Sequence, residues 1–418
     1  MTETKKVFRW IPVFASIAIQ MCLGTAYIWG VFQSHLIISP STPDALFNWP
    51  PTHGTLAYAL LLLFLTLGST VGGKLIQKSY SPRVVIMSGG ILLGLGFFIA
   101  MFTTQNTPWL LWLSYGVLGG VGMGFAYTTT IATCQKWFPD KKGMVTGIIV
   151  AALGFGGLIF TPVAEALIAR FDVLKTFAIF AAMFIVVSIV GSYFIKNPPE
   201  GFKPEGWVAP AANLKVSSGY NFRPSEALKT PQFYMITLAL MTASAAGSMM
   251  IPMAKILGLQ PGSGLSTEAA VAGVMIIAGC NSFGRLFWGS VSDRLGRKLT
   301  IMLLMMITAA AISSIAFTSG LIMLAVIAVI GFSYGGLLGV FPALTSDYWG
   351  PQHLAINYGM ILIGFGAGAV VSSYLVAYFS QTQNFAAAFL IAGSAAVLGV
   401  IVMLFAKAPR ATREESAS

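Results

Sequence analysis

The chain has 418 residues, of which 56% are hydrophobic and only 9% are charged. A soluble domain averages about 25% charged residues, so this composition excludes a water-soluble globular protein and indicates an integral membrane protein. The net charge of +11 would suit a nucleic-acid-binding protein, but the distribution of the basic residues along the chain provides a different explanation.

Apolar stretches of about 20 residues can cross a hydrocarbon core of roughly 30 Å as helices. Twelve such stretches follow one another, centred near Gln20, Phe64, Gly94, Gly120, Leu153, Met183, Ala239, Ala278, Thr308, Ala328, Gly366 and Val397. The longest break between them is polar and divides them six and six. We therefore expect an all-α integral membrane fold. Its predicted parts are a six-helix half at 1–196, a cytoplasmic linker at 197–225, a second six-helix half at 226–408 and a cytoplasmic tail at 409–418.

The basic residues predict how the chain is oriented in the membrane. If the N-terminus lies inside, all but four of the 24 basic residues are cytoplasmic, and the exceptions are Arg170, Lys175, Lys255 and Arg285. This asymmetry is the positive-inside rule, and it explains the net charge without a nucleic-acid partner. Met1 leads into a long apolar span without a small-residue cleavage site, which predicts an uncleaved first helix. The expected location is a bacterial cytoplasmic membrane, with both termini cytoplasmic.

The two halves of the chain resemble each other. "GIIVAALGFGG" from Gly147 is similar to "GMILIGFGAG" from Gly359, in the fifth and eleventh spans. "GGKLIQKSYSPR" follows the second span, and "GSVSDRLGRK" follows the eighth. Two related six-helix halves are typical of transporters that bind their substrate near the membrane midplane, between the halves.

The turn "GSVSDRLGRK" contains the signature G-x-x-x-D-R-x-G-R-K, by which the chain resembles the major facilitator superfamily. The first copy departs from the signature, because Gln77 occupies the acidic position. Four further motifs are "GTAYIWGVF" from Gly24, "KWFPDKKGMVTG" from Lys136, "LKTPQFY" from Leu228 and "NYG" from Asn357. They resemble the oxalate/formate antiporters and the related bacterial monocarboxylate transporters. The resemblance covers nearly the whole chain and implies the major facilitator fold and transport of small organic anions.

Arg285 stands where a charge is costly. It lies eight residues before Asp293, so it is about 12 Å inside the cytoplasmic end of the eighth span. A charged side chain near the bilayer centre costs roughly 3 to more than 10 kcal/mol. Its guanidinium can pair bidentately with a substrate carboxylate, or it can cap carbonyl groups of a neighbouring helix. The resemblance implies an anion-facing arginine here, so we expect Arg285 to bind the substrate.

Other residues are candidates for the same substrate site. Asn281 lies one turn before Arg285 on the same helix face, where its amide can contact the substrate or a neighbouring helix. The resemblance implies that Tyr127 and Tyr334 line the cavity, with Tyr27 and Leu153 as further positions. Taken without the resemblance, each of these four side chains also suits an ordinary buried core.

The number of cations predicts the substrate class. The resemblance implies a second cation, a lysine in oxalate antiporters, at the position that Phe365 occupies here. An oxalate dianion needs two positive partners to offset its desolvation, whereas a monocarboxylate needs one. We therefore expect the substrate to be L-lactate, pyruvate or a similar acid. Together with the resemblance to monocarboxylate transporters, the missing second cation favours proton-coupled symport. The expected transport unit is a monomer. Organic anion exchange of the oxalate/formate type is the alternative.

Two further sites are predicted outside the centre of the membrane. His53 opens the second span at the outer face, and its unperturbed pKa of about 6.5 suits proton or substrate entry, although plain surface exposure is the alternative. Asp293, Arg294 and Arg297 are expected to form a conformational clasp at the cytoplasmic end. The alternative for these three residues is that their charges only mark a turn.

The remaining functional classes fit the sequence less well. An integral-membrane enzyme would need clustered intramembrane His, Asp or Glu residues, and the spans contain no such cluster. A sensor would need a soluble signalling domain, but both tails and the central loop are short. Cys22, Cys134 and Cys280 all fall inside apolar runs, so we expect neither disulfides nor a cysteine-based metal site. No cofactor is expected either.

Overall fold

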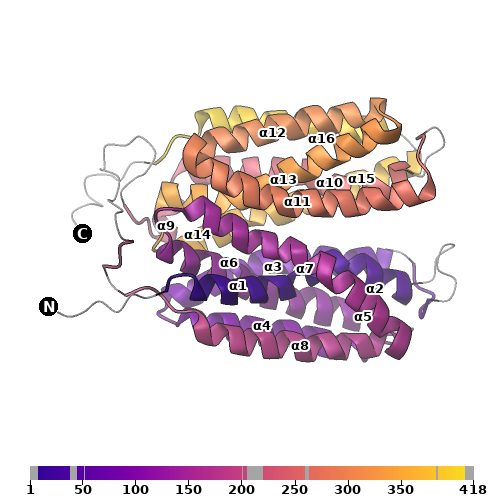
Figure 1. Ribbon diagram of the computed structural model, residues 1–418, viewed down its shortest axis with the longest axis horizontal. Helices are drawn as coiled ribbons and strands as arrows, with labels where there is room; N and C mark the ends of the chain where they lie inside the picture. Colours follow the sequence, from indigo (N-terminus) through magenta and orange to yellow (C-terminus); the bar gives the residue numbers. More distant parts are fainter. Residues whose placement is uncertain are drawn as a thin grey trace.

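The computed structural model describes residues 8–37, 45–50, 52–199, 201–204, 220–258, 263–382 and 385–409. Long helices run along the long axis of the molecule (Figure 1). The first half contains α1 (Ile11–Leu23), η1 (Gly24–Ile28), α2 (Trp29–Leu36), α3 (Thr52–Gln77), α4 (Pro82–Ala100), α5 (Pro108–Leu111), η2 (Trp112–Gly119), α6 (Gly120–Trp137), α7 (Lys142–Phe171) and α8 (Val173–Phe194). The second half contains α9 (Pro224–Ala227), α10 (Pro231–Gly258), α11 (Thr267–Leu295), α12 (Arg297–Ser314), η3 (Ile315–Phe317), α13 (Gly320–Trp349), α14 (Leu354–Ile361), α15 (Ile363–Thr382) and α16 (Phe385–Phe405).

The predicted membrane-spanning helices are present. Among the described residues, eleven helical segments are long and apolar enough to cross a membrane. They match every predicted span except the one near Ala278. That span is α11, whose 29 residues are long enough to cross. The expectation of an all-α multi-pass membrane fold is confirmed.

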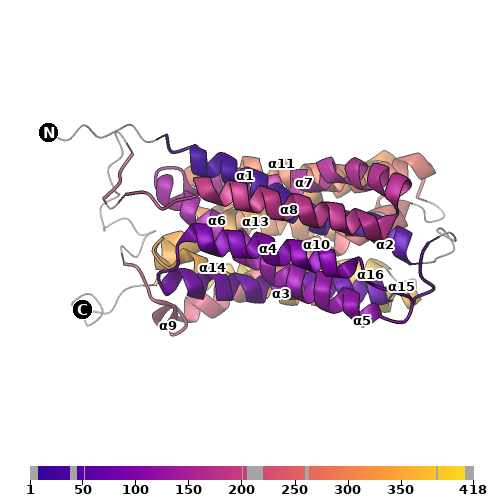
Figure 2. The same ribbon diagram turned by 90° about the horizontal axis from the view of Figure 1, so that it is seen from below.

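The helices form two bundles that lie side by side. In Figure 1, the indigo to magenta helices of the first half lie below the orange to yellow helices of the second half. Figure 2, seen from below, shows α4 and α8 of the first bundle in front. The helices pack closely: a Cβ on Gly335 of α13 would collide with the backbone of Asn281 in α11. Small residues allow this approach in lipid, where van der Waals packing holds helices together.

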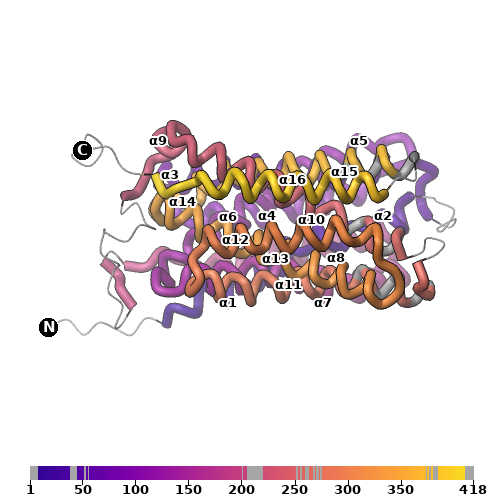
Figure 3. Tube along the Cα trace, turned by 90° about the horizontal axis from the view of Figure 1, so that it is seen from above, coloured from indigo at the N-terminus to yellow at the C-terminus, as the bar shows by residue number. Residues whose placement is uncertain are grey.

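Two helices of the first bundle, α7 and α3, make the most extensive contacts with the second bundle. The helix α7 packs against α11 and α13, and α3 packs against α14 and α15. In Figure 3, α11 runs along the lower edge of the second bundle, where α7 is also labelled. A Cβ on Gly147 of α7 would collide with the backbone carbonyl of Arg285. The backbone of α11 around Arg285 therefore lies directly against the first bundle.

Two helices of the first bundle lose regular α-helical geometry near their middle. The first span turns into a 3₁₀ helix at η1, and the fourth span is π-helical at η2. Such departures within a helix often occur at functional sites. Tyr27 lies in η1 and Tyr115 in η2. Below, the end of the molecule where α1 begins and α16 ends is called the termini end (Figure 1).

Candidate functional site

Arg285 connects the two bundles at mid-depth. It is the nineteenth residue of α11, and only 1% of it is exposed. Its Nη1 donates a hydrogen bond to the backbone oxygen of Val150 in α7 at 2.7 Å. Its Nη2 donates to the hydroxyl of Tyr27 in η1 at 2.5 Å. Both partners belong to the first bundle, so this side chain bonds across the interface between the bundles.

The charge of Arg285 has only neutral hydrogen-bond partners in the described chain. The Tyr27 ring adds a cation–π contact, with its centroid 5.6 Å from the guanidinium carbon. The carbonyl of Val150 fulfils the alternative expectation of a cap on a neighbouring helix. However, the Nε of Arg285 is buried and has no described partner. A buried cation that faces only dipoles and an aromatic ring remains a favourable place for an anion.

Asn281 presents a second unsatisfied group one turn from Arg285. It is 2% exposed, and neither its Nδ2 nor its Oδ1 has a hydrogen-bond partner among the described residues. Its side chain therefore bonds neither Arg285 nor a neighbouring helix. Leaving a buried amide unpaired costs about 1–3 kcal/mol, and such groups in native proteins usually mark an absent water, ion or ligand. Asn281 and the Nε of Arg285 are thus two orphaned groups on one helix.

The structure brings the three predicted tyrosines together around Arg285. Tyr127 in α6 is 5% exposed and Tyr334 in α13 is 3% exposed. Each of them interacts electrostatically with both Arg285 and Tyr27. Leu153 lies in α7, one turn beyond the carbonyl that Arg285 caps, and is buried. The predicted apolar position Phe365 is half-buried in α15.

Two more tyrosines belong to this cluster, and the sequence analysis missed both. Tyr58 of α3 interacts electrostatically with Tyr27. Tyr358 of α14 interacts with Tyr127 and Arg285, and its hydroxyl is buried. The motif "NYG" contains Tyr358, but the sequence analysis used this motif only as part of the family resemblance and not to predict a site residue. Nothing in the sequence around Tyr58 separates it from an ordinary core tyrosine.

His53 lies apart from the Arg285 cluster. It is in the first turn of α3, at the end opposite Gln77, and its ring packs edge-on against Trp112 with centroids 5.1 Å apart. At the same end of the bundle, Nε2 of His35 lies 3.1 Å from Oε2 of Glu165. This contact is open to solvent, because the two side chains are 40% and 51% exposed. The sequence analysis did not consider His35.

The predicted clasp at the termini end centres on Asp293. Its carboxylate accepts hydrogen bonds from the backbone N–H groups of Gly143, at 3.0 Å, and Met144, at 2.9 Å. These N–H groups open α7, so Asp293 caps a helix of the opposite bundle, where the helix dipole favours negative charge. Arg297, one turn after Asp293, forms an ion pair with the same carboxylate.

The membership of the clasp differs from the prediction. Arg294 is exposed, and none of the ion pairs among the described residues includes it. Asp347 of α13 takes part instead: it accepts from the Nε of Arg297 at 3.3 Å and pairs with Lys142 of α7 at 3.1 Å. The clasp is therefore a network that crosses the interface twice, once by the ion pair of Lys142 and Asp347 and once by the backbone hydrogen bonds to Asp293. Within the described ranges, no group of three or more His, Cys, Asp or Glu residues could hold a metal ion.

Comparisons with known proteins agree with this geometry. The sequence pattern of the Major Facilitator Superfamily matches residues 10–286 and 278–418. YhjX of Escherichia coli (strain K12), an uncharacterized MFS-type transporter, is 32% identical over 87% of this chain and 86% of its own length. The oxalate:formate antiporter of Oxalobacter formigenes is 26% identical, over 87% and 85%. Apicoplast pyruvate carrier 1 of Toxoplasma gondii is 24% identical, over 91% and 86%. The crystal structure of FucP in the outward conformation shares the fold, with a TM-score of 0.69 and 15% identity over 96% of this chain and 99% of FucP.

Proposed function

Since the chain belongs to the Major Facilitator Superfamily, we propose that it is a proton-coupled symporter of small monocarboxylates such as L-lactate or pyruvate. The superfamily moves small solutes across membranes, and the buried Arg285 with neutral partners supports an anion as the solute here. We place the termini end in the cytoplasm of a bacterial cell, because the basic residues gather there. The two six-helix halves would then alternate in exposing the site to either side.

Substrate binding would begin at the guanidinium of Arg285. Because this side chain is only 1% exposed, an anion reaches it after Tyr27 moves away. The carboxylate then accepts from Nη2 and Nε in the planar, bidentate geometry that a guanidinium prefers. The amide of Asn281, unpaired in the described chain, donates to the same anion. Tyr127 and Tyr334 enclose the organic part of the substrate.

The contacts of Arg285 also bear on coupling. An exchanger requires that the empty carrier cannot reorient, and an unpaired buried cation would supply that barrier. Arg285 can bond the carbonyl of Val150 and the hydroxyl of Tyr27, and these two partners would lower the barrier when no substrate is bound. This favours symport, in which the empty carrier returns. The similarity to the oxalate:formate antiporter favours organic anion exchange, which remains the second candidate.

The proton-binding group is a separate part of the proposal. No described carboxylate contacts Arg285, so the proton would be taken by the bound acid itself or by a group at the end of the bundle opposite the termini. The candidates there are His53 and the pair of His35 and Glu165. Histidine is suited to this role because its unperturbed pKa lies near working pH.

Transport in liposomes tests the coupling. In proteoliposomes without internal anions, an inward proton gradient is expected to drive accumulation of labelled lactate, and a protonophore should abolish it. The control is the same vesicles with the gradient collapsed before lactate is added. Accumulation that requires preloaded anions and ignores pH would establish the exchanger instead.

Charge number is expected to decide specificity. Phe365 cannot neutralise a second carboxylate, so oxalate and malonate should compete with labelled lactate at least roughly tenfold more weakly than pyruvate does. Phe365→Lys supplies the missing cation and should narrow that gap. Inhibition constants from competition assays measure both effects, and equal potency of oxalate and pyruvate on the unmodified protein would reject a one-cation site.

A further inference from the structure

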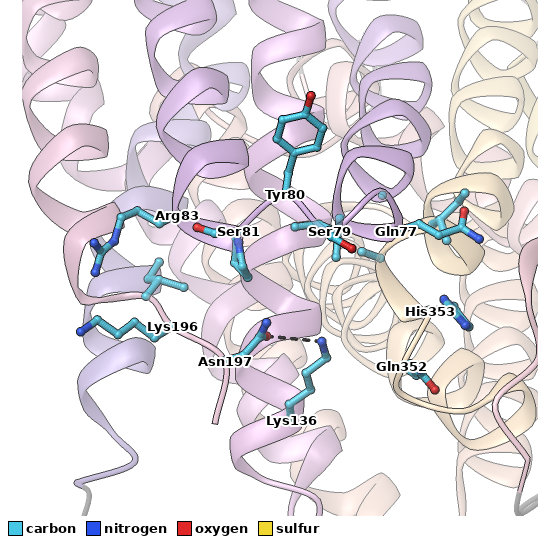
Figure 4. Close-up of a pocket in the computed structure, with 16 residues that line it drawn as sticks. Gln77, Ser79, Tyr80, Ser81, Arg83, Lys136, Lys196, Asn197, Gln352 and His353 are labelled. Carbon is cyan, nitrogen blue, oxygen red and sulfur yellow. Dashed lines mark hydrogen bonds between the residues drawn. The ribbon is translucent and has the colours of Figure 1, made fainter. Parts of the chain in front are cut away.

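A cavity of about 670 Å³ lies at the termini end (Figure 4). Neither Arg285 nor any tyrosine of its cluster lines this cavity. Both bundles form its walls. The first bundle contributes the turn between α3 and α4, the end of α6 and the chain after α8. The second bundle contributes the start of α14, with His353 and the two residues after Leu354. A ligand in this cavity would therefore contact both halves at once.

The cavity is lined by cations whose described partners are neutral. Lys136 donates from Nζ to the amide oxygen of Asn197 at 3.3 Å, as the dashed line in Figure 4 shows. Arg83 donates to the backbone oxygen of Tyr193 at 2.8 Å, and its Nε is buried without a described partner. Lys196 is exposed at the edge of the cavity. The ion pairs within the described ranges all involve other residues.

The local charge balance also acts on His353. Burial lowers the pKa of His353 below its ordinary value, and the positive charges of Arg223 and Lys136 lower it further. The carboxylate of Glu226 acts in the opposite direction. The charged groups that act on His353 are thus two cations and one carboxylate, and an anion in the cavity would offset this excess of positive charge.

A comparison of the two halves of the chain shows that the cavity lacks a carboxylate. Aligning "GKLIQ" with "GSVSD" places Gln77 opposite Asp293. Asp293 supplies the carboxylate that joins the end of α11 to the start of α7 across the interface. Gln77 lines the cavity, is exposed and carries no charge. The equivalent contact, between the end of α3 and the start of α14, therefore has no carboxylate at this position.

The helix start that Asp293 caps also has a counterpart. The repeat aligns Gly147 with Gly359, so residues 143–144 correspond to residues 355–356. The N–H groups of residues 143–144 bind the Asp293 carboxylate. Residues 355–356 open α14 and line the cavity, and α14 has no side-chain cap. The cavity thus occupies the position where the pseudo-symmetry of the fold puts a negative charge.

We propose that this cavity binds a phosphate-bearing anion that replaces the missing carboxylate and holds the two halves together at the termini end. Several acceptor oxygens and a double negative charge suit Lys136 and the start of a helix, with the further cations Arg83 and Lys196 along the opposite edge of the cavity, better than a single carboxylate does. The volume suits a small ligand rather than a bare ion. The phosphate can belong to a lipid headgroup or to a soluble phosphate ester, and the two sources are separable by experiment.

Thermal unfolding of the purified protein tests the site. In detergent, inorganic phosphate is compared with chloride at equal ionic strength. In nanodiscs, phosphatidylcholine alone is compared with a mixture containing phosphatidylglycerol. Lys136→Gln combined with Lys196→Gln removes two cations, and Lys196→Gln alone is the milder variant. Lys78→Gln is the matched control, because Lys78 is exposed on the same turn and does not line the cavity.

Phosphate, anionic lipid or both are expected to raise the unfolding temperature. The double variant should need roughly tenfold more phosphate for the same shift, or lose the shift, whereas Lys78→Gln should keep it. Gln77→Asp should raise the unfolding temperature without phosphate and weaken the response to it. A shift in detergent identifies a soluble phosphate, and a shift only in nanodiscs identifies a headgroup. Equal unfolding temperatures in every pair of conditions, or a full response from the double variant, would overturn the proposal.

Discussion

Arg285→Ala is expected to reduce transport of a labelled monocarboxylate to the background level of empty liposomes. The substitution removes the cation that we propose pairs with the substrate. A hydrogen bond to a charged group contributes about 1.5–3 kcal/mol, so losing two of them weakens binding by roughly 10²–10⁴-fold. Arg285→Lys should also lose most activity, because an ammonium group is a point charge and cannot reproduce the planar, bidentate guanidinium.

The controls separate loss of binding from loss of structure. Arg294→Ala removes an exposed arginine from the same helix and should leave transport close to normal. Unfolding temperature and monodispersity establish that the Arg285 variants are folded. Arg285→Lys keeps the charge at this depth, so it remains informative if the alanine variant is unstable. A folded Arg285→Ala protein that transports at near-normal rates would show that the substrate binds elsewhere.

The fold was largely predictable because the bilayer imposes one strong requirement on the chain. Each span must be apolar over about 20 residues, and this signal survives without any knowledge of neighbouring helices. The interruptions η1 and η2 were not predictable, because they depend on which helices pack beside them. Gly24, for example, begins η1, where a Cβ would collide with the backbone of α7. This contact joins residues more than a hundred positions apart.

The candidate site was predictable in its chemistry and less so in its contacts. Arg285 was identifiable because a charge at that depth is costly, whatever surrounds it. Its bonds to Val150 and Tyr27 were not, because they join two halves that the sequence does not orient relative to each other. The same reason applies to Asp347, which lies at the end of α13 like any turn-marking charge. Only the folded chain shows that it pairs with Lys142 of the other half.

Asp293→Asn is expected to open the termini end of the molecule. Asparagine can still accept one backbone N–H bond, but it loses the ion pair with Arg297 and the second bond to the start of α7. Breaking a buried pair costs about 3–5 kcal/mol. The side chains of Asp293 and Arg297 are 18% and 9% exposed, so solvent reduces this to about 2 kcal/mol. That free energy shifts the equilibrium towards the open state roughly thirtyfold.

Cysteine labelling measures the opening of the termini end. Ser346 is 1% exposed and precedes Asp347 in the clasp, so Ser346→Cys reacts with a maleimide only when this end opens. In a background without the three native cysteines, Asp293→Asn should speed labelling roughly thirtyfold. Asp172→Asn is the matched control, since Asp172 pairs with Lys175 at the opposite end and both side chains are largely exposed. It should leave the labelling rate unchanged, because exposed pairs contribute little. If Asp293→Asn also left it unchanged, the network of Asp293, Arg297 and Asp347 would not be what holds the halves together at this end.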